Sequence, residues 1–101
     1  MVASRIDIPR EPLGEFCTRW KVRELSLFGS VLRADFGPES DVDVLVSFEP
    51  DAAWSYWEWP EMIDELATIF GRRVDLVERE SLHNPFRRAE ILRTRQVVYA
   101  S

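Results

Sequence analysis

Several features are scarce in this chain of 101 residues, and each scarcity excludes a class of site. Cys17 is the only cysteine and His83 is the only histidine. A disulfide within the chain and a zinc site built on cysteines are therefore excluded, and so is any Cys–His or Ser–His catalytic pair without His83. We expect Cys17 to be a small, buried apolar residue on a helix face.

Long apolar runs and excess positive charge are also lacking. No apolar run approaches the length of a membrane-spanning helix, and the start, MVASRIDIPR, lacks the basic flank and apolar core of a secretory signal. The formal net charge of −5 argues against a general nucleic-acid binder, although a bound metal would still allow a nucleotide substrate. We therefore expect a cytoplasmic protein that binds neither a membrane nor, directly, nucleic acid.

The order of the expected elements indicates a single α/β domain over residues 1–101. Apolar residues at helical spacing predict helices over 11–20 and from about 60 to 70, and Asn84-Pro85 is typical of the start of a helix that reaches about 93. Apolar or alternating runs predict strands over 23–28, 41–48, 72–78 and 96–100, and residues 30–36 predict a short helix. The pattern favours a short sheet covered by helices.

The most informative stretch, residues 27–48, places two aspartates at the start of a strand. Asp41 and Asp43 project from the same side of an extended chain, with Cα atoms roughly 7 Å apart, so both carboxylates can converge on one cation. Without a cation, two such charges about 5 Å apart repel by roughly 3 kcal/mol at an effective dielectric near 20. The pair predicts a divalent-metal site; the alternative is a surface strand with two solvated aspartates.

The turn before this strand offers a place for an anion. Gly29 and Ser30 form a small-residue turn whose backbone N–H groups, with the Ser30 hydroxyl, can hold phosphates. Arg33 either bonds a phosphate or pairs with an acid of its own loop, and Ser40 turns the loop into the strand. A metal beside a phosphate is the arrangement that phosphoryl and nucleotidyl transfer require.

Asp75 is the best candidate for a third carboxylate, because it is a lone acid inside the apolar strand VDLV. If its strand lies beside the strand of Asp43, the two side chains share a face. The alternatives are an edge-strand position or an ion pair with Arg72 or Arg73.

Gly29-Ser30, ten residues, then Asp41-Val42-Asp43 resembles the signature of the DNA polymerase β-like nucleotidyltransferase superfamily. From Phe16 through FGSVLRADFGPESDVDVLV to VDLVERESLHNPFRRAEIL, the chain is similar to the minimal nucleotidyltransferase (MNT) branch. The resemblance implies the nucleotidyltransferase fold, a small mixed sheet of about four strands flanked by helices, with Mg²⁺ as the metal and ATP as the substrate. It implies metal ligands that are also the catalytic residues, namely Asp41, Asp43 and Asp75, and nucleotide-binding residues, namely Gly29, Ser30, Arg33 and Ser40.

The same resemblance implies a partner. Members of this branch typically act as antitoxins to a HEPN-domain ribonuclease toxin encoded beside them, and transfer AMP onto a tyrosine of that toxin. Neutralisation by such transfer is the leading hypothesis. The alternative is a non-catalytic module that masks the toxin by forming a stoichiometric complex.

Two clusters of side chains remain open in function. Four aromatic residues follow the second strand and favour a partner surface near the active site, with at least one ring exposed; the alternative is packing under the next helix. They are Trp54, Tyr56, Trp57 and Trp59. The second cluster consists of arginines near the C-terminal end of the sequence: Arg87, Arg88, Arg93 and Arg95. They could bind an acidic partner or the nucleotide phosphates; the alternative is that they form a solvated helix face.

Overall fold

The fold follows the expected order of helices and strands. A computed structural model describes residues 8–32, 37, 40–55 and 57–101. Its elements are α1 (Arg10–Arg19), β1 (Val22–Phe28), the 3₁₀ turn η1 (Gly29–Leu32), β2 (Val42–Phe48), α2 (Glu58–Phe70), β3 (Val74–Glu78), the 3₁₀ turn η2 (Arg79–Ser81), α3 (Pro85–Thr94) and β4 (Gln96–Ala100). Of the short helix expected over 30–36, the structure describes η1, whereas residues 33–36 lie outside the described residues.

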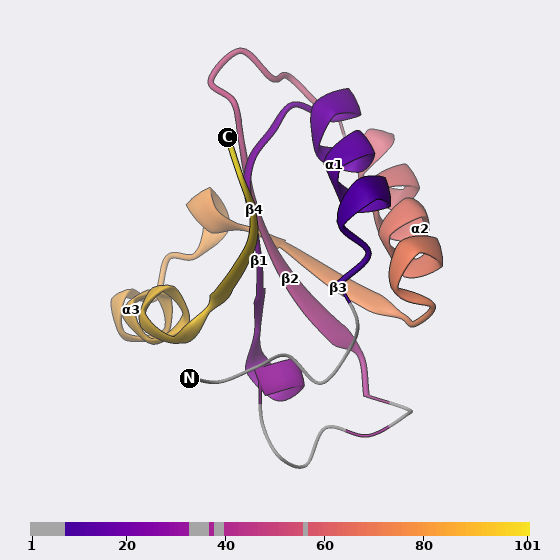
Figure 1. The fold of residues 1–101 in the computed structure, drawn as a ribbon. Coiled ribbons are helices and arrows are strands. Elements are labelled where there is room, and N and C mark those ends of the chain that lie inside the picture. Colours follow the sequence, from indigo (N-terminus) through magenta and orange to yellow (C-terminus); the bar gives the residue numbers. More distant parts are fainter. Residues whose placement is uncertain (1–7, 33–36, 38–39, 56) are drawn as a thin grey trace.

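The strands form one mixed sheet with the order β3-β2-β1-β4 (Figure 1). β1 pairs antiparallel with both β2 and β4, whereas β2 and β3 are parallel. Parallel neighbours need a crossover connection, and α2 provides it between β2 and β3. The predicted fold, a small mixed sheet flanked by helices, is confirmed.

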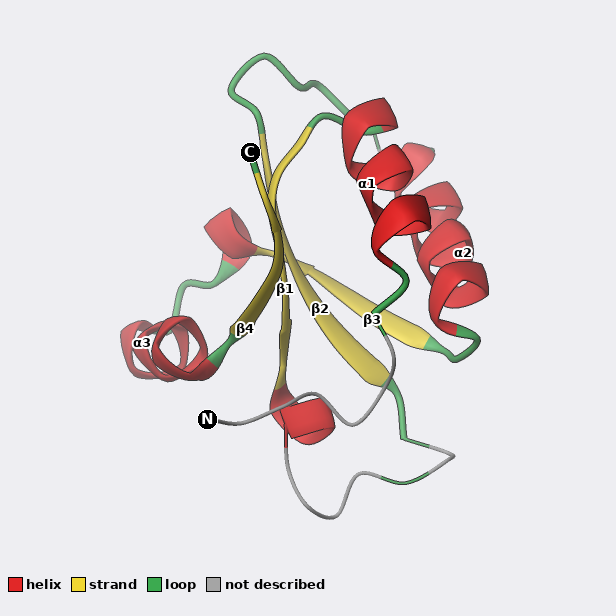
Figure 2. Ribbon diagram, in the orientation of Figure 1, coloured by secondary structure: helices red, strands yellow, loops and turns green. Residues whose placement is uncertain are grey.

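The two faces of the sheet are covered by different helices. α1 and α2 pack side by side on one face, and α3 lies alone on the other (Figure 2). Side chains of β2 alternate between them: Val44 and Val46 join the core under α1 and α2, whereas Leu45 packs with Ile91 of α3. By this alternation Asp43 belongs to the face that α3 covers.

Local signals end and begin the helices where the sequence predicts. Gly71 ends α2 in the left-handed conformation, with φ of 69°. Asn84 begins α3, because its side-chain oxygen accepts hydrogen bonds from the backbone N–H groups of Phe86 and Arg87 at 3.0 and 3.1 Å. Cys17 is buried on α1, as expected, and burial raises the pKa of its thiol to about 12. Across the ranges that the structure describes, no helix combines the length and the apolar character needed to cross a membrane.

Candidate active site

The parallel pairing of β2 with β3 brings two of the predicted carboxylates together. Asp43 and Asp75 are register partners, one step into each strand from its N-terminal end. Paired residues on neighbouring strands point to the same face and lie roughly 5 Å apart. The expected position of Asp75 beside Asp43 is therefore found. Its side chain is exposed, and β3 is an edge strand, so the alternative position also describes it. Two carboxylates so placed attract a cation, for the electrostatic reason given above.

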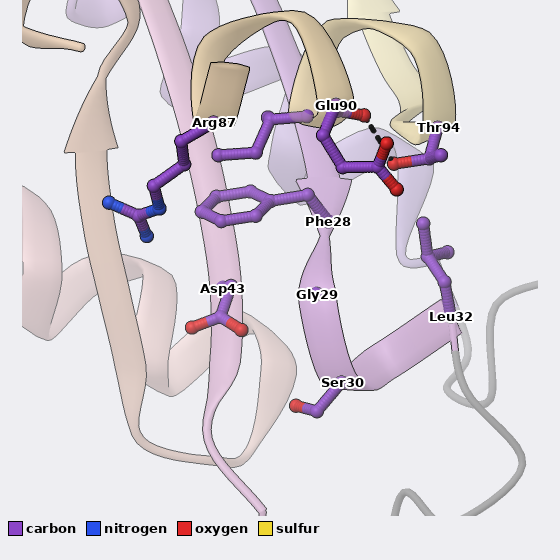
Figure 3. Close-up of a pocket in the computed structure, with 9 residues that line it drawn as sticks. Phe28, Gly29, Ser30, Leu32, Asp43, Arg87, Glu90 and Thr94 are labelled. Atoms are coloured by element: carbon purple, nitrogen blue, oxygen red, sulfur yellow. Dashed lines mark hydrogen bonds between the residues drawn. The ribbon is translucent and has the colours of Figure 1, made fainter. Parts of the chain in front are cut away.

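Gly29 lies against the Asp43 carboxylate in a backbone conformation that favours glycine. β1 ends at Phe28, which pairs with Asp43, and the chain then turns at Gly29 with φ of 71°. A Cβ atom at this position would lie 2.4 Å from Asp43 Oδ2. The sharp bend therefore sets Gly29 directly beside the Asp43 carboxylate, and Ser30 follows it along the chain (Figure 3).

Polar contacts anchor the chain on both sides of the loop that links Ser30 to β2. The Ser30 hydroxyl donates to the carbonyl oxygen of Asp41 at 3.3 Å, which ties the bend to the start of β2. The hydroxyl of Ser40 accepts from Gly37 N–H at 3.1 Å. Arg72 then donates to the Gly37 carbonyl at 2.8 Å, a contact that the sequence offered no signal to predict. The predicted nucleotide-binding residue Arg33 lies outside the described residues.

Asp41 lies just before β2 and is more open to solvent than Asp43. Its carboxylate pairs with the guanidinium of Arg73 at 3.1 Å, and both side chains are at least half exposed. Such a surface pair contributes about 0–1 kcal/mol, so it is easily exchanged for a stronger cation. Among the described residues, no three His, Cys, Asp or Glu side chains already converge as a metal-binding group.

A pocket of about 580 Å³ opens between this end of the sheet and α3 (Figure 3). One wall comes from the bend and β2, and includes Gly29, Ser30 and Asp43. The other wall comes from α3, and includes Arg87, Glu90 and Thr94, with Phe28 and Ile91 as apolar lining. The pocket thus combines two carboxylates, Asp43 and Glu90, with a glycine bend and the Arg87 guanidinium, around a space large enough for a nucleotide.

Sequence reasoning did not single out Arg87 among the arginines near the C-terminal end. The helical spacing of three or four residues places one set of side chains on the same face of α3: Arg87, Glu90, Ile91 and Thr94. Assigning the residues of α3 to faces would therefore have grouped Arg87 with the other residues of the pocket wall. Two other arginines form ion pairs: Arg93 with Glu90, and Arg95 with Glu24 at 2.9 Å.

The aromatic cluster does not lie near the pocket, and this part of the prediction is wrong. Asp43 is near the N-terminal end of β2, whereas Trp54 follows the C-terminal end of the same strand. The loop after β2 accordingly lies at the opposite end of the sheet from η1 (Figure 1). The expected split in exposure is found: Trp57 is 84% exposed, whereas Trp54 and Trp59 pack partly against the core. Tyr56 lies outside the described residues.

Comparison with known proteins identifies similar sequences and folds. The family described as "Nucleotidyltransferase domain" matches residues 10–98. The protein adenylyltransferase MntA of Thermococcus cleftensis is 38% identical over 85 residues, which cover 84% of this chain and 81% of that relative. A crystal structure of a toxin-antitoxin with AMP-PNP has a TM-score of 0.72 at 18% identity, covering 93% of this chain and 75% of the neighbour. A structure of a tri-AMPylated Shewanella oneidensis HEPN toxin in complex with MNT antitoxin has a TM-score of 0.63 at 18% identity, covering 91% of this chain and 70% of the neighbour.

Proposed function

Because this chain belongs to the nucleotidyltransferase domain family, we propose that it transfers AMP from ATP to a tyrosine hydroxyl of a partner HEPN ribonuclease toxin and so neutralises that toxin. Support comes from a relative named a protein adenylyltransferase and from a structural neighbour in which a HEPN toxin is tri-AMPylated. The neighbour with AMP-PNP supports ATP as the donor.

The close approach of Gly29 to Asp43 is the observation that carries this proposal. Because Gly29 has no side chain, the Asp43 carboxylate can lie against the bend. A phosphate bound by the backbone N–H groups of the bend would then lie beside Asp43. A phosphate and a carboxylate repel, so such a site requires a cation between them. The donors present suit Mg²⁺, which typically takes one or two carboxylates and completes its shell with substrate phosphates and water. A group of three protein ligands is therefore not required in advance.

Each residue then has a defined part in the reaction. The tyrosine oxygen forms a bond to the α-phosphorus of ATP, the bond from that phosphorus to the bridging oxygen breaks, and pyrophosphate leaves. Asp41 and Asp43 would hold Mg²⁺, which when bound would neutralise charge on the α-phosphate and on the departing pyrophosphate. The backbone of Gly29 and Ser30 binds the phosphates, and Arg87 adds positive charge from the α3 wall of the pocket. Asp75, exposed beside Asp43, orients the tyrosine hydroxyl and accepts its proton.

The remaining predicted nucleotide-binding residues belong to the loop before β2. We assign Ser40 the role of shaping that loop, which agrees with its hydrogen bond to Gly37 N–H. Arg33 is assigned to the phosphates on the sequence pattern alone.

The test is rescue of growth in cells that produce the partner toxin. Asp43→Asn is expected to abolish rescue, whereas Asp64→Asn, an exposed aspartate on α2, is expected to rescue as the wild type does. Both variants are to be produced at equal level and shown to be folded by circular dichroism. Transfer of label from ATP carrying an α-phosphate label to the toxin should follow the same order.

A second candidate function, masking of the toxin by stoichiometric binding, is favoured by the 84% exposed Trp57. It predicts the reverse pattern in the same cells. Asp43→Asn would rescue growth fully, and Trp57→Ala would not. That result would replace the transfer reaction with a binding function.

A further inference from the structure

A groove opens at the end of the sheet that is remote from the pocket. Its volume is about 650 Å³, and its walls include Trp54, Trp59, Leu76 and Glu78. An adjoining hollow shares both tryptophans and Glu78 and adds Glu80 and Arg23. We call the space between these residues the tryptophan groove. Nothing in the transfer reaction makes use of it.

The two indole rings of the groove are held in place. The Trp54 indole N–H donates to the carbonyl oxygen of Trp20 at 2.9 Å, and its ring packs edge-on against the Trp20 ring with centroids 5.2 Å apart. Trp59 packs edge-on against Phe48 with centroids 6.5 Å apart. Because these contacts fix both rings, the partly exposed aromatic surfaces form a rigid wall that is ready for a ligand.

Glu78 adds a carboxylate to this wall. Its carboxylate makes no hydrogen bond or ion pair with any residue in the described ranges, whereas neighbouring Glu80 bonds the Ser47 hydroxyl at 3.1 Å. Burial, and after it the charge of Glu80, raises the pKa of Glu78. A positive charge brought into the groove would stabilise the ionised carboxylate and so oppose both effects on the pKa of Glu78.

We propose that the tryptophan groove binds an arginine side chain carried by a segment of a partner protein. A planar guanidinium can stack on an indole face and at the same time bond a carboxylate through two N–H groups, which a lysine ammonium cannot do. Trp57, 84% exposed within the same loop, provides apolar surface for the rest of the segment. The net charge of −5 adds long-range attraction for a basic segment.

The test uses the full chain labelled with ¹⁵N and a capped Gly-Arg-Gly peptide, followed by NMR. We expect saturable shifts of the Trp54 and Trp59 indole signals and of the Glu78 amide. The matched peptide with citrulline, which keeps the shape of arginine but lacks its charge, is expected to produce no saturable shift. Glu78→Gln is expected to weaken binding roughly fivefold or more, the scale of a partly desolvated cation–aromatic and charge contact.

Two controls define the failure of this proposal. Glu61→Gln removes an exposed carboxylate from α2 outside the groove and is expected to bind the peptide as the wild type does. Asp43→Asn is also expected to bind it normally, so failure of the transfer reaction leaves this result untouched. Equal binding of the citrulline peptide, undiminished binding by Glu78→Gln, or shifts confined to the Gly29–Asp43 pocket would each overturn the proposal.

Discussion

At the scale of single residues, Gly29 decides whether the candidate active site can exist. Gly29→Ala forces an alanine into a left-handed backbone conformation. It also places a Cβ atom 2.4 Å from Asp43 Oδ2, so the carboxylate must move. We expect AMP transfer to fall by roughly a hundredfold or more, because a displacement of about 1 Å among reacting groups has an effect of that size. The measurement is the initial rate of transfer from labelled ATP.

Gly71→Ala is the matched control for Gly29→Ala. Gly71 has nearly the same φ, 69°, but a Cβ there would have no atom within 4 Å. Both variants should lose about 1–2 kcal/mol of unfolding free energy from backbone strain, whereas only Gly29→Ala should lose transfer activity. Equal activity of the two variants would show that the close approach to Asp43 is irrelevant to the reaction.

Cys17 links stability to pH. Burial raises the pKa of its thiol from about 9 to about 12, so between these values the unfolded chain releases a proton that the folded chain retains. The free energy of unfolding contributed by Cys17 should therefore fall as pH rises above about 9, by roughly 1.4 kcal/mol per pH unit until the folded thiol ionises. The same burial should protect the thiol from alkylating reagents in the native state.

The measurement is urea unfolding of the wild type and of Cys17→Ala at pH 8 and pH 10. The difference in stability between the two proteins should shrink at the higher pH, because the alanine has no proton to release. A difference that is independent of pH would mean that the thiol is not desolvated.

At the scale of elements, α3 carries Arg87, Glu90 and Thr94 to the pocket, and Asn84 fixes where that helix begins. Asn84→Ala leaves the first-turn N–H groups of α3 without their side-chain acceptor and should lower unfolding free energy by about 1 kcal/mol. Because Arg87 lies in this first turn, we expect the KM for ATP to rise more than kcat falls.

The check combines steady-state kinetics with amide hydrogen exchange of α3. Thr68→Ala is the control, since its exposed hydroxyl bonds the carbonyl one turn back on α2. Faster exchange confined to the first turn of α3 is the expected result for Asn84→Ala. Unchanged exchange and kinetics would mean that the cap does not position the pocket wall.

Elements were predictable because their signals are local. Gly71 ends a helix through its left-handed backbone, and Asn84-Pro85 begins one through a hydrogen-bonded cap. Both signals act within a few residues and do not depend on the rest of the fold. Side chains alternate along a strand, so Asp43 and the buried Val44 lie on opposite faces of β2. The proximity of Asp75 to Asp43 followed only once the two strands were taken as neighbours.

At the scale of the whole molecule, local signals no longer suffice. Arg87 enters the pocket because α3 covers the face of the sheet that holds Asp43. The sequence around Arg87 does not indicate which face of the sheet α3 covers. Trp54 was expected near the site because aromatic residues cluster after the second strand and are typical of binding surfaces. The seven residues of β2 instead carry the chain roughly 20 Å away, to the opposite end of the sheet.

This separation gives the molecule two distinct regions. The pocket at one end of β2 is assigned to nucleotide and acceptor, and the tryptophan groove at the other end is assigned to a basic segment of a partner. A partner that engaged both would be held at two points more than a strand length apart. Avidity of this kind strengthens a complex only if its geometry allows simultaneous contact.

The most direct test of the central claim is the intact mass of the purified partner toxin after incubation with ATP, Mg²⁺ and this protein. We predict that the wild-type protein increases the toxin mass by one or more AMP groups. An equally folded Asp43→Asn variant should leave the mass unchanged. An equal increase with both proteins, or no increase with either while the toxin is still neutralised, would show that transfer of AMP by the Asp43 site is not how the toxin is neutralised.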